Sequence, residues 1–357
     1  MKQGVRAAAG FASALLTALG VICVAVRLPS GAGHNTAAAA AQFILPAGNA
    51  AGFFSEEEDD GTGPSRTSSA GSSQTARGSA ASSSSPAQSA AGSQPSSSAA
   101  ASAQSGKVLE LSVGNGGTQV GNMWIKNTTE HHTAINFAQE LQKAPAVKMA
   151  RNSSSPQVLI YHTHTTESYN CVARTTDLTK TVCAVGDKIA EQLQSAGVGV
   201  LHDKTCHDYP AYDGSYDRSQ ATMRKDLNKY PGIQVTLDIH RDAMHRDDGT
   251  MLKTTAVVGG KKAAQMMILA GCDDDGSLGF PNWECNLRLA LRLQKALGED
   301  YPGLARPLDF CARRYNENMT KGSLLIEIGT DANTLDEAEY TGSLLGKTLA
   351  RVLGGLT

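Results

Sequence analysis

Residues 156–169, PQVLIYHTHTTESY, join a short apolar run to a polar turn that carries two histidines and a glutamate. An apolar, partly β-branched run of this length, bounded by Pro156 and a polar loop, is typical of a buried β-strand. Strands that are buried on both faces belong to parallel sheets covered by helices. Ligands of such sheets bind beyond the carboxyl ends of the strands, so we expect the turn after Tyr161 to carry function.

The alternation of strand and helix continues to the C-terminus. Apolar runs predict further strands at residues 198–201, 233–239, 253–258, 265–270 and 323–328. Apolar residues at helical spacing predict helices at 185–196 and 283–297. We also expect a helix at 215–230, ending before Pro231, and a closing helix at 334–353. This pattern predicts an α/β fold, with a twisted, largely parallel (mixed) sheet flanked by helices on both faces.

The N-terminal part has the composition of an anchor and a tether. Lys2 and Arg6 precede an uncharged run, residues 7–26, which is long enough to cross a bilayer as a helix. A cleaved signal peptide is the alternative, and either one exports the rest of the chain. We expect a cytoplasmic N-terminus and transmembrane anchor at 1–28, a disordered Ser/Ala-rich linker at 29–106, a small lead-in segment at 107–155 and a globular domain at 156–357.

The overall composition excludes two classes of nucleic-acid-binding protein. The 357 residues include 32 Lys+Arg and 34 Asp+Glu, for a net charge of -2, which rules out a strongly basic nucleic-acid binder. Aromatic residues make up only 5% of the chain, so a surface for stacking bases is not expected either.

Polar clusters mark the ends of three predicted strands. The first cluster holds His162, His164 and Glu167, the second is Asp238-Ile-His240-Arg-Asp242, and Glu327 lies within LIEIGT. If the three strands run parallel, the clusters meet at one edge of the sheet. An unpaired carboxylate inside an apolar strand is costly, so Glu327 is expected to have a functional partner there.

These residue types suit a zinc hydrolase. A catalytic zinc takes about three protein ligands and keeps one position for water, and histidine nitrogens and carboxylate oxygens are suitable ligands. Glu167 and His240 are candidate ligands. Positions two apart along a strand face the same way, so His162 and His164 could both point into the site. Alternatively, one of them binds the metal and the other supports it. Glu327 is the candidate base that takes a proton from the water.

Several neighbouring side chains have two interpretations at this stage. Arg241 either binds a substrate carboxylate or forms a surface ion pair. Asp238 and Asp242 either support the ligands from outside or cap turns. Cys171 and Cys183 flank one polar loop and are the pair we expect to form a disulfide if the exported cysteines are oxidised, with free buried thiols as the alternative.

Four sequence blocks resemble the stage II sporulation protein P family. They are YHTHTTESY (161–169), DIHRDA (238–243), RYNENMTKGSLLIEIGT (314–330) and the NTLDEA that follows. The resemblance covers nearly all of residues 156–357, and it implies similarity to zinc-dependent N-acetylmuramoyl-L-alanine amidases. Carried over residue by residue, it implies zinc on His164, Glu167 and His240, and Glu327 as the catalytic glutamate.

The same resemblance implies a biological setting. The enzyme would be a single-pass protein of the septal or engulfing membrane of the mother cell, with its catalytic domain outside the cytoplasm. It would cut septal peptidoglycan during sporulation engulfment, with peptide cross-links as a further substrate. The implied partners are stage II sporulation proteins D and M. The alternatives are a zinc peptidase acting on stem peptides and a catalytically inactive wall-binding scaffold.

Overall fold

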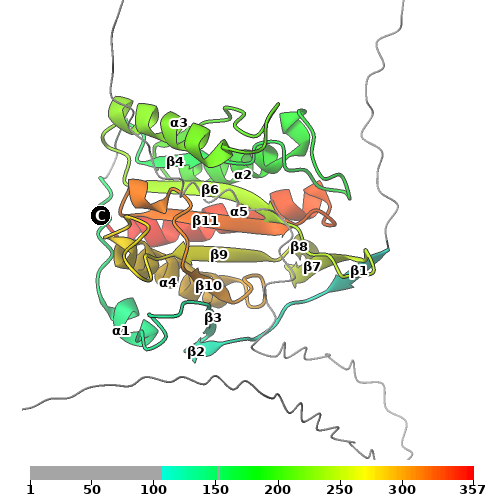
Figure 1. The fold of residues 1–357 in the computed structure, drawn as a ribbon, viewed down its shortest axis with the longest axis horizontal. Coiled ribbons are helices and arrows are strands. Elements are labelled where there is room, and N and C mark those ends of the chain that lie inside the picture. Colours follow the sequence, from blue (N-terminus) through cyan, green and yellow to red (C-terminus); the bar gives the residue numbers. More distant parts are fainter. Residues whose placement is uncertain (1–106, 151–152, 154) are drawn as a thin grey trace, which may run out of the picture. The chain divides into compact units, whose positions relative to one another are not determined.

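An eight-stranded sheet forms the centre of the described part of the chain, which is residues 107–150, 153 and 155–357 of the computed structural model (Figure 1). Across the sheet the strands lie in the order β2 (Thr118–Val120), β3 (Met123–Asn127), β10 (Leu308–Cys311), β9 (Met266–Gly271), β11 (Ser323–Thr330), β6 (Val235–Asp242), β4 (Val158–Tyr161) and β5 (Val200–His202). Neighbouring strands are parallel except at β2–β3 and β9–β11. The predicted mixed, largely parallel sheet is therefore confirmed.

Helices cover both faces of this sheet because successive strand residues point in opposite directions. Val158 and Ile160 of β4 belong to the main core, which also takes residues of α2 (Val182–Ser195), α4 (Trp283–Asp300) and α5 (Leu335–Gly354). Leu159 and Tyr161 face the other way and pack with Met223 of α3 (Ser215–Lys229). The candidate site lies on the face toward α3, because Tyr161 on that face is the register partner of Asp238. Leu325 and Met267 lie in a further small cluster apart from the main core.

The helix ends follow the expected local chemistry. Thr334 and Glu337 form a capping box at the start of α5, in which each side chain bonds to the backbone N–H of the other residue. Thr181 caps α2, and Gly197 takes a φ of 79° just beyond the end of that helix, where a left-handed residue ends it.

Residues 107–155 are part of the fold and not a separate lead-in, so the boundary predicted at 156 is wrong. β2 and β3 extend the central sheet next to β10. β1 (Val108–Leu111) pairs with β7 (Met251–Val258) in a three-stranded sheet completed by β8 (Lys261–Ala264). The short helix α1 (Phe137–Gln142) packs against α4. β1 and β3 pair with β7 and β10, which lie more than a hundred residues further along the chain, so local patterns could not show that this segment joins the sheets.

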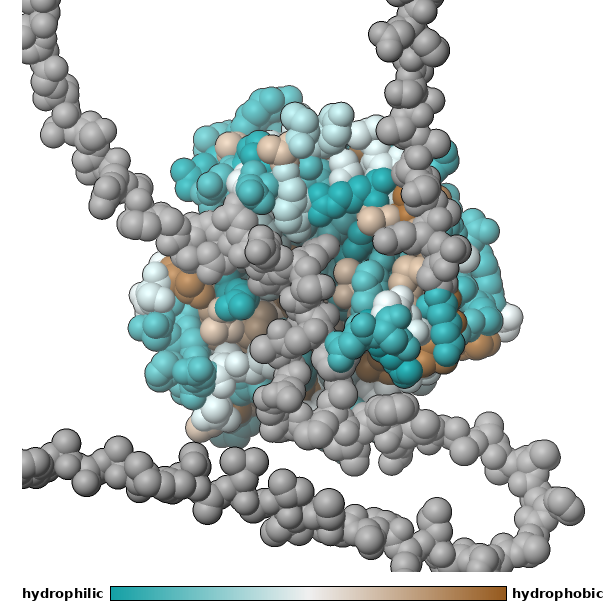
Figure 2. All heavy atoms as spheres, turned by 45° about the vertical axis from the view of Figure 1, so that its right-hand side comes forward, coloured by the Kyte–Doolittle hydropathy of each residue, from teal (hydrophilic) through white to brown (hydrophobic). Residues whose placement is uncertain are grey.

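The predicted anchor at 1–28 and linker at 29–106 lie outside the described residues. Within the described residues, no helix combines the length and apolarity needed to span a bilayer. All six cysteines in this part of the chain carry free thiols, so the expected Cys171–Cys183 disulfide is wrong. Where described residues are visible in Figure 2, hydrophilic ones predominate and hydrophobic ones form small groups.

Candidate metal centre

The three polar clusters meet at one edge of the sheet, as predicted. β11, β6 and β4 are adjacent and parallel, so their carboxyl ends share an edge. Glu327 is the register partner of His240, and Tyr161 is the partner of Asp238. Register partners on neighbouring strands project from the same face, so His240 and Glu327 lie side by side on the α3 face.

Glu167 and His240 form the closest pair of candidate ligands. The Nδ1 atom of His240 lies 3.6 Å from Oε2 of Glu167, and both side chains are buried. The rings of His164 and His240 are nearly perpendicular, with centroids 5.2 Å apart. Two imidazoles and a carboxylate from two strand ends therefore surround one small volume.

Burial and mutual attraction set the charges of this pair. Burial alone would raise the pKa of Glu167, but the charge and hydrogen bond of His240, together with Arg241 and His164, outweigh it and hold the pKa at about 2. Burial alone would lower the pKa of His240, but Asp238 and Glu167 raise it well above its usual value. In the metal-free protein this pair is thus an ion pair, which a bound cation would replace.

His164 packs against two tyrosines, Tyr212 and Tyr216, which the sequence analysis did not predict. Its ring stacks on Tyr212 with centroids 4.5 Å apart and an interplanar angle of 15°. The Tyr212 hydroxyl lies 3.2 Å from Nε2, and the Ser215 hydroxyl lies 3.4 Å from Nδ1. The Arg174 guanidinium covers the other face of Tyr212 at 3.8 Å. No apolar or charge pattern singles out Tyr212 or Ser215 in the sequence.

His162 points away from this site. Its Nδ1 donates to the carbonyl of Ile239 at 2.8 Å, and its Nε2 lies 2.9 Å from Nε2 of His202. Burial, followed by His202, lowers the pKa of His162 to about 3, so the ring is neutral and its Nε2 accepts from His202. Both nitrogens are therefore in use. Of the two alternatives left open by the sequence, the structure brings His164, and not His162, beside His240.

Asp238 supports His240 from behind. Its carboxylate accepts from the backbone N–H and hydroxyl of Thr163 at 2.8 and 2.6 Å, and its Oδ1 lies 2.9 Å from Nε2 of His240. The imidazole nitrogen is not aimed at that oxygen, and it makes no directed hydrogen bond although it is buried. A small rotation of the ring would complete the carboxylate–histidine arrangement that commonly orients a metal ligand.

One carboxylate oxygen of Glu327 is buried, and the rest of the residue is partly exposed. Its Oε2 is buried without a hydrogen-bond partner, although the residue as a whole is only partly buried. Burial raises the pKa of Glu327 well above its usual value, opposed by His240 and reinforced by Asp242 and Glu167. A carboxylate held ready to accept or carry a proton beside a candidate metal centre suits acid–base chemistry.

Arg241 is a buried side chain that bonds to backbone carbonyls, whereas both of our interpretations placed it at the surface. The residue is only 4% exposed. Its guanidinium donates to the carbonyls of Ser168 at 3.0 Å and Ala173 at 2.7 Å, and its backbone N–H donates to Oε2 of Glu167 at 3.0 Å. Arg241 thus ties the loop after Glu167 to the end of β6 and fixes that carboxylate in place.

We expect Arg241→Met to destabilise the protein by about 2–4 kcal/mol, because it leaves two carbonyls without donors and removes a buried side chain. Chemical denaturation measures this, with Arg292→Met as the matched control, since Arg292 also donates to two carbonyls but near α1 and far from the site. A variant of unchanged stability with a raised KM would instead restore the substrate-binding role.

The donor set has the chemistry of a zinc site. Two nitrogens and a carboxylate oxygen are typical zinc ligands. The buried Oε2 of Glu327 has no hydrogen-bond partner, as expected where a bound group completes a site. Among the described residues, however, the donors of His164, Glu167 and His240 do not all lie within 4.8 Å of one another.

A second group of potential ligands is already engaged in structural contacts. His132, Cys272 and Asp274 present donor atoms within 4.8 Å of one another. The Asp274 carboxylate accepts from the backbone N–H groups of Glu130, His131 and His132 at 2.8–3.0 Å. Nε2 of His132 lies 3.2 Å from the carbonyl of Asp273. These bonds tie the segment before α1 to the loop after β9, so we interpret the group as a clamp.

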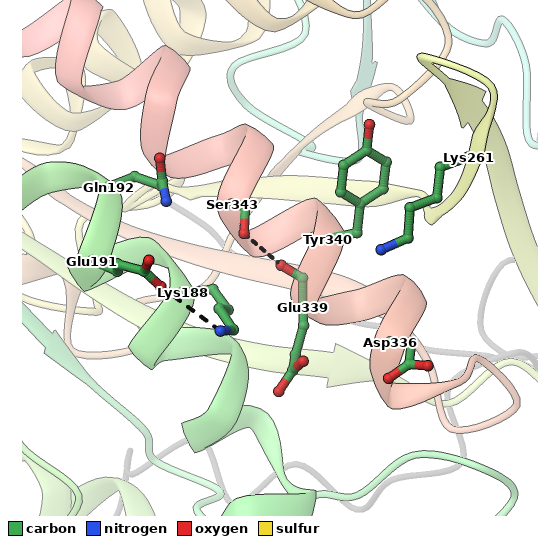
Figure 3. Close-up of a pocket in the computed structure, with 8 residues that line it drawn as sticks. All are labelled: Lys188, Glu191, Gln192, Lys261, Asp336, Glu339, Tyr340 and Ser343. Carbon is green, nitrogen blue, oxygen red and sulfur yellow. Dashed lines mark hydrogen bonds and ion pairs between the residues drawn. The ribbon is translucent and has the colours of Figure 1, made fainter. Parts of the chain in front are cut away.

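A hollow between α2 and α5 lies apart from the candidate site (Figure 3). It has a volume of about 300 Å³. Its lining residues are Lys188, Glu191, Gln192, Lys261, Asp336, Glu339, Tyr340 and Ser343. None of the predicted site residues is among them, and both signs of charge are present. We assign no function to this groove.

The chain belongs to the stage II sporulation protein P (SpoIIP) family, whose model matches residues 68–352. It is 31% identical over 202 residues to stage II sporulation protein P of Bacillus subtilis (strain 168), an alignment that covers 51% of this chain and 47% of that protein. The aligned region thus spans about half the length of this curated relative.

Solved structures of amidases give weak structural matches. The N-acetylmuramoyl-L-alanine amidase AmiC2 of Nostoc punctiforme has a TM-score of 0.32 at 13% identity, covering 57% of this chain and 96% of that one. The CwlD amidase from Clostridioides difficile, in complex with the GerS lipoprotein, has a TM-score of 0.33 at 14% identity, covering 55% and 94%. Ami1 from Mycobacterium smegmatis has a TM-score of 0.33 at 12% identity, covering 58% and 100%.

Proposed function

We propose that this chain is a zinc-dependent peptidoglycan hydrolase that cleaves the amide between N-acetylmuramic acid and L-alanine. The observation that carries the proposal is the convergence of His164, Glu167, His240 and Glu327 from three adjacent parallel strands. Membership of the stage II sporulation protein P family supports cell-wall hydrolysis during sporulation as the setting.

The chain's own residues divide the work of amide hydrolysis. His164, Glu167 and His240 would hold the ion, with Asp238 orienting His240 through its Oδ1. When bound, zinc supplies a Lewis acid that lowers the pKa of a bound water and polarises the substrate carbonyl. Glu327 takes a proton at its accessible carboxylate oxygen and delivers it to the leaving amine nitrogen.

We further propose that the protein works on septal peptidoglycan while tethered by residues 1–28 to the engulfing membrane of the mother cell. Stage II sporulation proteins D and M are the proposed partners. Affinity capture of the full chain from sporulating cells is expected to recover both. Recovery of neither protein would contradict the proposed partnership with stage II sporulation proteins D and M.

Product analysis separates the amidase from its alternatives. Digestion of purified sacculi by the full chain is expected to release stem peptides with a free L-alanine amino group. The muramic acid should keep a free lactyl carboxylate. Cut cross-links with the muramoyl amide intact would identify a peptidase on stem peptides. Unchanged sacculi in the presence of added zinc would identify a wall-binding scaffold.

Zinc is expected to stabilise the folded protein. A ligand that binds only the native state at about 100 times its Kd adds about 2.7 kcal/mol to the free energy of unfolding. Thermal denaturation of chelator-treated protein with and without added zinc measures this gain. The gain should vanish in His240→Ala, and a gain of equal size in that variant would place the ion elsewhere.

A further inference from the structure

Arg306 joins two strands beside the candidate site. Its backbone N–H donates to the carbonyl of Met266 on β9 at 2.7 Å. Its Nη1 donates to Oδ2 of Asp242 at the end of β6 at 2.8 Å, and both side chains are buried. Arg306 thus links the start of β9 to the end of β6, the two strands on either side of β11.

The rest of the guanidinium has no acceptor. Arg306 is only 4% exposed, and its Nε and Nη2 atoms are buried without a hydrogen-bond partner. These two nitrogens form one edge of the planar fork, whose parallel N–H groups are shaped to meet a pair of oxygens or a single shared one. A buried cation with an unused edge is costly, so a polar group is expected there.

Glu327 is a candidate acceptor on β11, the strand between β9 and β6. It is the register partner of Met267 on β9 and of His240 on β6, one residue from Met266 and two residues from Asp242 along those strands. Its Oε2 is buried and also lacks a partner. Besides burial and His240, Asp242 and Arg306 both act on the pKa of Glu327, which is consistent with their proximity.

We propose that Arg306 is a positioning residue for Glu327, whose inner oxygen, Oε2, it holds through one ordered water on its Nε–Nη2 edge. Asp242 fixes the other end of the guanidinium. A buried water of this kind needs two to four polar partners, and the two nitrogens and the carboxylate oxygen supply three. The accessible oxygen of Glu327 then stays directed toward the reacting water. This inference rests on the proposed function.

A double-mutant cycle with Arg306→Met and Glu327→Gln tests the inference in the full-length, zinc-loaded protein on soluble peptidoglycan fragments. We expect Arg306→Met to lower kcat by about 10²-fold with KM and zinc content unchanged, since a misplaced catalytic group costs about that much. In the Glu327→Gln background the same substitution should change kcat by less than twofold. Arg288→Met, which breaks the Arg288–Glu140 pair between α4 and α1, is the matched control and should keep wild-type kcat.

Metal-free protein provides a second readout. The denaturation midpoint of the double mutant should fall by less than the sum of the two single shifts, since one contact is lost in all three variants. If Arg306→Met does not fold, Arg306→Lys replaces it in the double-mutant cycle. Lysine keeps the positive charge toward Asp242 but lacks the Nε–Nη2 edge of the guanidinium.

Two results overturn the inference and are distinguishable from each other. Additive losses in kcat and in midpoint would show that Arg306 does not act through Glu327, and would leave the proposed function intact. Full activity of Glu327→Gln alone would remove the catalytic role of Glu327, and the proposed mechanism with it.

Discussion

Glu327→Gln is expected to lower the turnover of sacculi by about 10²–10⁴-fold while the protein still binds one zinc ion. General acid–base catalysis by a single side chain contributes about this factor. The amide is nearly isosteric with the carboxyl group but can neither accept the proton from water nor pass one to the leaving amine. Dye release from labelled sacculi and metal analysis of the same sample measure the two properties.

The matched control for this prediction is Glu191→Gln on α2. The Glu191 side chain is 61% exposed, and it pairs with Lys188 and not with a candidate ligand. It should retain wild-type turnover. Activity above a tenth of wild type in Glu327→Gln would assign the proton transfers to another group. Loss of zinc together with activity would mean that Glu327 holds the ion.

Replacing His164 and His162 in turn is expected to give opposite results. His164→Gln should abolish stoichiometric zinc binding and reduce activity by more than the 10–100-fold that loss of an outer partner typically costs. His162→Gln should keep one zinc per chain, because His162 bonds to Ile239 and His202 and faces away from His240. Its effect should appear as a lower melting temperature.

The comparison has a clear contrary outcome. If His162→Gln loses zinc and His164→Gln retains it, then the bound state has a different arrangement of the turn after β4 from the one described here. Thermal denaturation of both variants in chelator separates a loss of ligand from a loss of fold.

The strand ends could be predicted because they combine strong local signals. The buried run before His162, the run before His240 and the run around Glu327 are each apolar, and parallel strands bring their carboxyl ends to one edge. The predicted helices around α2 and α4 were likewise indicated by their apolar spacing, and Pro231 marked the end of α3. Local chemistry was sufficient wherever a segment is long and its periodicity regular.

Other features depend on contacts that sequence spacing does not encode. His162 and His164 are two residues apart, but they follow the end of β4, where strand alternation no longer fixes their directions. Arg241 resembles a substrate-binding residue until its guanidinium is seen to bond to the loop at 168–173. Arg306 has no local signal at all, since its partner Asp242 is 64 residues away.

Anomalous diffraction at the zinc edge, from crystals of the zinc-loaded full chain, tests the central claim most directly. We predict one peak at about 2.0–2.2 Å from a nitrogen of His164, a nitrogen of His240 and an oxygen of Glu167, with the Glu327 carboxylate facing the remaining position. A peak at His132, Cys272 and Asp274, or no peak between β4 and β6, would contradict the account.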